Sequence, residues 1–200
     1  VHSGVAGRLG DSPPRPDGIA KTQGSFSFAG DLHADGMLWG ATLRSPHPYA
    51  RIVSIDVSGA WQINGVEAVI TAADVPGVPT YGLISHDPPV FAHDVVRFQG
   101  EPVAAVAADH PDTCRRALTA IKVEYEVLTP LTDPEHAIDG SFPPIHPDGN
   151  VVRHQRIVRG DQTINGPVVV EGTYELGRQD QAFLGLEAAL AYPDSGGGGV

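Results

Sequence analysis

Hydrophobic and polar residues alternate in short runs between residues 37 and 128, a pattern typical of strands and not of long helices. The alternation is clear over residues 51–57, where Val53, Ile55 and Val57 are expected on one face. Residues 103–108 are all apolar, and such a run predicts a strand buried on both faces. Further short strands are predicted over residues 37–43, 66–71, 95–98 and 122–128.

A helix is predicted directly after the apolar strand. The run Asp109-His-Pro-Asp112 is a typical helix start, with Asp109 as the candidate cap. Apolar residues then recur at helical spacing, at Cys114, Ala117, Leu118 and Ile121. Because almost no residues connect the elements, we expect strands 103–108 and 122–128 to share one sheet under this helix. Cys114 is then a small core residue and not a nucleophile.

The rest of the chain has weaker patterns. Residues 1–20 show no periodicity and are expected to form an extended arm, whereas residues 129–150 are polar and proline-rich, as in a surface connector. Residues 168–174 predict a second β segment. The 24 glycines and 18 prolines indicate many short elements joined by turns, which excludes a coiled coil or a bundle of long helices.

Charge and cysteine content exclude several classes of function. The net charge of −11 argues against binding to nucleic acid or to anionic membranes. The single cysteine excludes an internal disulfide, an iron–sulfur cluster and a cysteine-rich zinc site. The first 20 residues lack the apolar core of a secretory signal, and no apolar run has membrane-spanning length, so we expect a cytoplasmic protein.

Common catalytic signatures are missing, and no two of the nine histidines have the spacing of a helical metal site, so we expect no metal ligands in this chain. Two short stretches nevertheless contain many polar or charged side chains. The first is Arg44–Arg51, which is interpreted as a rigid corner whose arginines bind carbonyls or carboxylates. The second is Gly177–Glu187, where neutral amides such as Gln179 could hydrogen-bond an oxo or carbonyl group; an exposed loop is the alternative.

These stretches resemble a known family, and so do several short motifs that occur in the same order along the chain. The motifs are Arg15–Lys21, Ala29–Leu32, Leu43–His47, Ala50–Ile52, Ala73–Pro76, Gln99–Ala104 and Val123–Glu126. The sequence resembles the molybdenum-binding large subunit of the xanthine dehydrogenase/aldehyde oxidase family, the molybdenum hydroxylases. The run Gln179–Leu184 looks most like the D-type subunits of bacterial xanthine dehydrogenases.

The resemblance implies an α+β fold and a division into domains. It implies an N-terminal arm over residues 1–19, an α/β-hammerhead domain over 20–130, a connector over 131–165, and the start of the first molybdopterin-binding domain over 166–200. Gln179 matches the glutamine that hydrogen-bonds the apical oxo ligand of molybdenum in family members. Position 181, often His in the family, is Gln here.

The resemblance also implies a reaction, cofactors and partners. Family members hold molybdenum on molybdopterin, and the likeness to D-type subunits implies hydroxylation of a purine of the xanthine type, or of a related heterocycle, with oxygen from water. The electrons pass through [2Fe–2S] clusters to FAD on partner subunits. The glutamate that acts as general base and the glycine-rich cofactor loop are expected beyond Val200, so we expect an N-terminal fragment with no catalytic residue of its own and no activity alone.

Two alternatives stay open on the sequence. The chain could belong to an aldehyde or carbon monoxide dehydrogenase large subunit, because the residues of the substrate pocket are expected outside it. It could also be a non-catalytic assembly module that binds only the iron–sulfur and flavin partners. A pure interface, however, does not require the polar insertion around Gln179.

Overall fold

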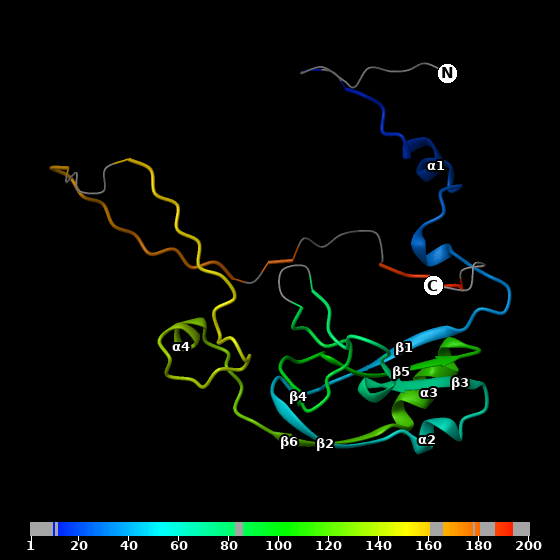
Figure 1. Ribbon diagram of the computed structural model, residues 1–200. Coiled ribbons are helices and arrows are strands. Elements are labelled where there is room, and N and C mark those ends of the chain that lie inside the picture. The colour runs from blue at the N-terminus through cyan, green and yellow to red at the C-terminus, as the bar shows by residue number, and fades with distance from the viewer. Residues whose placement is uncertain are drawn as a thin grey trace. The chain divides into compact units, whose positions relative to one another are not determined.

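The computed structural model describes residues 10, 12–82, 86–160, 166–177, 179–180 and 187–193 (Figure 1). The chain divides into two compact units. One is Gly36–Ile164, and the other combines Val1–Asp35 with Asn165–Val200.

The unit Gly36–Ile164 contains two three-stranded antiparallel sheets. The first has the order β1-β5-β3 and is built from β1 (Trp39–Arg44), β5 (Pro102–Ala108) and β3 (Val66–Thr71). The second has the order β4-β2-β6 and is built from β4 (Val95–Val96), β2 (Ala50–Asp56) and β6 (Lys122–Val127). All six strands predicted between residues 37 and 128 are therefore present, and the mixture of strands and helices confirms the α+β class.

The predicted sharing of one sheet by the strands on either side of the long helix is wrong. The helix α3 (Pro111–Ala120) connects β5 in the first sheet to β6 in the second. The physical reason is that β1 and β3 pair with the two edges of β5, so β6 cannot pair with β5 directly. Instead, β6 pairs with β2.

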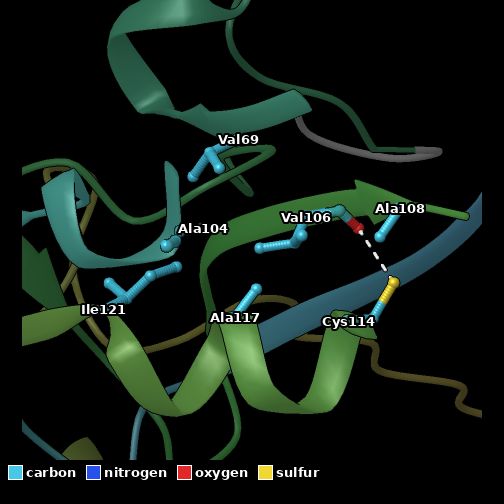
Figure 2. Packing of buried hydrophobic residues seen from close by; sticks show 8 residues of the cluster. Val69, Ala104, Val106, Ala108, Cys114, Ala117 and Ile121 are labelled. Carbon is cyan, nitrogen blue, oxygen red and sulfur yellow. Dashed lines mark hydrogen bonds between the residues drawn. The ribbon is translucent and has the colours of Figure 1, made fainter. Parts of the chain in front are cut away.

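The core of the first sheet lies between the sheet and α3 (Figure 2). Cys114, Ala117 and Ile121 from the helix face pack against Ala104, Val106 and Ala108 of β5. Most of these side chains are small, so the helix lies close to the sheet. The Cys114 thiol is 1% exposed and donates to the carbonyl oxygen of Trp39, with an Sγ–O distance of 3.0 Å. The interpretation of Cys114 as a core residue is confirmed.

A second buried cluster lies on the opposite side of β5. Its members are Ala50, Ala92, Val96 and Val103, with Tyr125 packed against them. Because Val103 belongs to this cluster while Val106 belongs to the first, β5 contributes buried side chains to both faces. The prediction of a strand buried on both faces is confirmed.

Two local predictions need correction. Val53 is 59% exposed and does not share the inward face of Ile55, because a bulge between Ile52 and Ser54 interrupts the alternation in β2. The cap of α3 is His110 and not Asp109: the Nδ1 atom of His110 accepts from the backbone N–H of Asp112 at 3.1 Å. The ring nitrogen of histidine here replaces the carboxylate that the sequence favoured.

Short helices complete the unit Gly36–Ile164: α2 (Ser58–Trp61), the 3₁₀ turn η2 (Ala72–Asp74) and α4 (Pro134–Ile138). Helix α4 lies in the segment predicted as a connector. The Asp133 side chain accepts from the N–H of Glu135 at 2.8 Å, and Pro134 follows as the first helical residue. The sequence therefore carried a helix-start signal there that the polar composition obscured.

The other unit has little regular structure among its described residues. It contains α1 (Gly18–Gln23) and the 3₁₀ turn η1 (Ala29–Asp31). The strand predicted over residues 168–174 is wrong, because these residues are irregular and Val170 and Tyr174 are 89% and 90% exposed. No described strand pairs with them, and an unpaired strand leaves its backbone groups without partners.

Candidate functional site

The segment Arg44–Arg51 forms a corner between β1 and β2, and its two arginines are bound to other parts of the unit. Arg44 Nη1 donates to the carbonyl oxygen of Gly100 at 2.8 Å. Arg51 Nε donates to Glu126 Oε2 at 2.9 Å across the pair β2–β6. One arginine thus binds a carbonyl and the other a carboxylate, which confirms the interpretation as a rigid corner.

The polar groups inside this corner bind one another. Ser45 is buried, its backbone N–H donates to the carbonyl of Glu101, and its carbonyl accepts from Gly100, both at 2.9 Å. The Ser45 hydroxyl lies 3.1 Å from both the N and the O of His47, and the His47 ring contacts Tyr125 edge to face at 5.0 Å. Burial raises the pKa of the Tyr125 hydroxyl, and a hydrogen bond to Ser45 partly opposes this. The corner therefore connects β1 to β2, and because its polar groups bind one another it has no free nucleophile.

Glu101 is a polar residue of the unit that the sequence reasoning did not select as a candidate. It follows the turn at Gly100, where φ is +93°, and it precedes β5. Its side chain is 2% exposed, and its Oε2 atom accepts from the backbone N–H of Arg97. A buried carboxylate is uncommon enough to indicate a specific role. The signal for it was the motif Gln99–Ala104, which carries part of the family resemblance.

Gln179, the predicted cofactor-binding residue, lies in the other unit. It is exposed and belongs to an irregular segment, as are Asp180 and Glu187. Gln181, Phe183 and Leu184 lie outside the described residues. An amide that binds an oxo ligand works best in an enclosed, water-poor site. Gln179 is exposed among the described residues, so it could take this role only where other residues enclose it. The described residues do not by themselves build a molybdopterin site.

The described part of the chain offers no metal cluster and no membrane-spanning helix. No three or more of its His, Cys, Asp or Glu side chains lie close enough together to bind a metal ion. None of the helices formed by these residues has the length and apolar character that crossing a membrane requires. Cys114 is buried, which raises the pKa of its thiol and disfavours the reactive thiolate.

Comparison with known proteins identifies the family of the chain. Residues 23–129 match the family described as "Aldehyde oxidase and xanthine dehydrogenase, a/b hammerhead domain". This match covers more than half of the 200 residues, so the chain belongs to this family and contains its hammerhead domain. The resemblance found in the sequence is confirmed.

Two relatives are similar to this chain over more than nine-tenths of its length. The chain is 38% identical over 187 residues to the probable D-type subunit of xanthine dehydrogenase from Bacillus subtilis (strain 168), covering 92% of this chain and 25% of that protein. It is 37% identical over 192 residues to the nicotinate dehydrogenase large molybdopterin subunit of Eubacterium barkeri, covering 94% and 45%. The chain therefore spans a quarter of one relative and less than half of the other.

Solved structures agree on the fold. Quinoline 2-oxidoreductase from Pseudomonas putida 86 is 38% identical with a TM-score of 0.58, covering 66% of this chain and 18% of that one. Reconstituted CO dehydrogenase from Oligotropha carboxidovorans is 35% identical with a TM-score of 0.61, covering 68% and 17%. These similarities confirm the hammerhead fold.

Proposed function

We propose that this chain is part of a molybdenum hydroxylase that introduces oxygen from water into a purine of the xanthine or hypoxanthine type, or into a related heterocycle. The observation that carries the proposal is the 38% identity to a probable D-type xanthine dehydrogenase subunit over 92% of the chain. The relatives named for nicotinate and quinoline also act on flat nitrogen heterocycles. Location in the cytoplasm stays a prediction.

Electron transfer in this proposal uses partner subunits or domains. Molybdenum on molybdopterin would supply the oxidation chemistry in the complete subunit, and [2Fe–2S] clusters and FAD on the partners would take up the electrons. The single cysteine of the chain supports this division, because a [2Fe–2S] cluster requires about four cysteine ligands. The remainder of the molybdenum subunit and the iron–sulfur and FAD subunits are therefore the proposed partners.

Gln179 is the one residue of the chain that we propose to contact the cofactor, as a hydrogen-bond donor to an oxo ligand. It carries no charge, so it can bind such a ligand without adding a second charge to the site. The predicted domain boundaries, with a molybdopterin-binding domain that starts near residue 166, belong to the same proposal. On its own, the 200-residue chain is expected neither to retain molybdenum nor to turn over substrate.

The first experiment uses the 200-residue chain alone. It is expressed in cells that make molybdopterin, and bound molybdenum is measured by mass spectrometry alongside oxidation of xanthine, nicotinate and an aldehyde. We expect neither metal nor turnover. Turnover by the chain alone would refute the proposal that residues outside it complete the site.

The second experiment tests Gln179 in the complete subunit with its partners. Gln179→Ala should lower the rate of xanthine oxidation about 100-fold, the scale seen when one stabilising donor is removed from an active site. Gln155→Ala, a change of the same kind at an exposed residue of the connector, is the control and should keep full activity. An unchanged rate in Gln179→Ala would favour a chain that serves only assembly.

The preferred substrate separates the remaining alternatives. Faster oxidation of aldehyde or carbon monoxide than of any purine would place the chain in an aldehyde or carbon monoxide dehydrogenase large subunit instead. Both activities occur among the names of the relatives, in the aldehyde oxidoreductase of Megalodesulfovibrio gigas and the carbon monoxide dehydrogenase large chain of Afipia carboxidovorans. The heterocycle is preferred because the xanthine and nicotinate relatives are 38% and 37% identical over 92% and 94% of the chain. The aldehyde oxidoreductase is only 32% identical over 93%, and the carbon monoxide dehydrogenase is 37% identical over only 70%.

A further inference from the structure

A cavity of about 490 Å³ lies in the unit Gly36–Ile164, next to the start of β5. Two aromatic residues, Tyr81 and Phe98, line it together with three prolines. The other lining residues are titratable: Asp87, Arg97, Glu101 and His146. Both rings are more than half exposed, so their surfaces are open to a ligand. The cavity therefore combines apolar and aromatic walls with a buried carboxylate.

The carboxylate of Glu101 is only half satisfied. Its Oε2 atom accepts from the backbone N–H of Arg97, and its Oε1 atom accepts from no described residue. In the described part of the chain, no buried side-chain nitrogen or oxygen is both sealed from solvent and without a partner. Although the residue is 2% exposed, Oε1 therefore keeps some accessible surface, and Glu101 is one of the residues that line the cavity.

The basic side chains that line the cavity do not pair with Glu101. Arg97 directs its guanidinium to the carbonyl oxygens of Val95, at 3.3 Å, and Ile145, at 3.4 Å. His146 lies 3.5 Å from a carboxylate oxygen of Asp87. No ion pair among the described residues includes Glu101. A buried carboxylate without a cation is costly, so a positively charged donor that enters the cavity would be bound favourably.

We propose that this cavity binds a planar amidinium or guanidinium group through Glu101. Such a group carries several N–H donors in one plane, and it can donate to a carboxylate oxygen while its flat face lies on an aromatic ring. The rings of Tyr81 and Phe98 provide that surface, and the prolines suit the apolar part of the ligand. The site is independent of Gln179 and of the proposed redox chemistry.

Two probes distinguish a free small molecule from a protein side chain as the source of the amidinium or guanidinium group. Benzamidine represents a free small amidine, and N-acetyl-arginine amide represents an arginine side chain of a protein partner. Each is titrated into the full 200-residue chain at low salt and followed by chemical shift changes of the backbone amides. We expect saturable shifts near residues 81, 98 and 101, and the probe that binds more tightly identifies the source. Benzamide and N-acetyl-citrulline amide, the uncharged counterparts, should bind at least tenfold more weakly.

Variants test whether Glu101 makes the contact. Glu101→Gln keeps the shape and an acceptor for Arg97 but removes the charge, and it should weaken benzamidine binding about tenfold or more. Glu126→Gln is the matched control: this exposed residue pairs with Arg51, and its variant should bind as the unchanged chain does. Phe98→Ala, at an exposed ring, should also weaken binding without unfolding the chain.

Three results would overturn the proposal. The first is the absence of saturable binding of either charged probe up to millimolar concentration. The second is equal binding of the charged and uncharged probes. The third is unchanged binding in a folded Glu101→Gln variant. If that variant melts early, the comparison of charged with uncharged probes on the unchanged chain and on Phe98→Ala decides the question.

Discussion

Gly59 of α2 lies close to the last residue of α3, Ala120, and it permits a sharp test of this packing. A Cβ atom at position 59 would lie 2.7 Å from the carbonyl oxygen of Ala120, well inside the 3.4 Å at which ordinary contacts begin. The obstacle is backbone, fixed between α3 and β6, so it cannot rotate away as a side chain could. Overpacking of this kind costs about 1–3 kcal/mol. The better helix propensity of alanine offsets up to about 1 kcal/mol, so Gly59→Ala should cost about 1–2 kcal/mol.

Thermal and urea unfolding, followed by circular dichroism, measure this cost. Gly59→Ala should lower the Tm by about 4–8 °C for a unit of this size. Gly40→Ala is the matched control, because Gly40 lies on β1 with no atom within 4 Å of the added Cβ and without a left-handed backbone. Its Tm should stay the same or rise slightly. Equal melting of the two variants would refute the close contact between α2 and α3.

Two further predictions concern titratable groups in the two buried clusters. The Cys114 thiol is buried and its pKa is raised, so a disulfide reagent at pH 8 should not label the native chain. The denatured chain should react at one thiol. Fast labelling of the native chain would contradict the packing of Cys114. Burial raises the pKa of Tyr125 above its ordinary value of about 10, so the unfolded state loses this proton first and the associated stability falls as the pH rises through the raised pKa. Urea unfolding between pH 8 and pH 11 should therefore lose more stability in the unchanged chain than in Tyr125→Phe, and equal losses would contradict this.

Local elements were predictable from the sequence because their signals are local. Alternation and apolar runs located all six strands, and helical spacing located α3 with its buried face. The distribution of strands between sheets was not predictable in the same way, because it depends on which edges are already paired. Both edges of β5 are occupied, by β1 and β3, and no property of the segment 122–128 itself reports that.

The need for a pairing partner also explains why the strand predicted over residues 168–174 is wrong. Three valines in a row favour an extended backbone, but a strand forms only when a neighbour supplies hydrogen bonds. The bulge in β2 is a related case, because one extra residue between Ile52 and Ser54 turns Val53 outward while the sequence pattern stays the same. Pairing, and not composition, decides both outcomes.

In the unit Gly36–Ile164, hydrogen bonding distinguishes polar side chains that stabilise the fold from those that could bind a ligand. Arg44 and Arg51 are bound to a carbonyl and to a carboxylate, and the hydroxyl of Ser45 stays within its own corner. Groups that are already paired in this way hold a fold together and have little capacity left for a ligand. Glu101 differs, because it is buried, it lines a cavity, and only one of its oxygens accepts from a described residue. A sequence can show that a glutamate is present, but only the folded chain shows that its neighbours leave half of the carboxylate for a ligand.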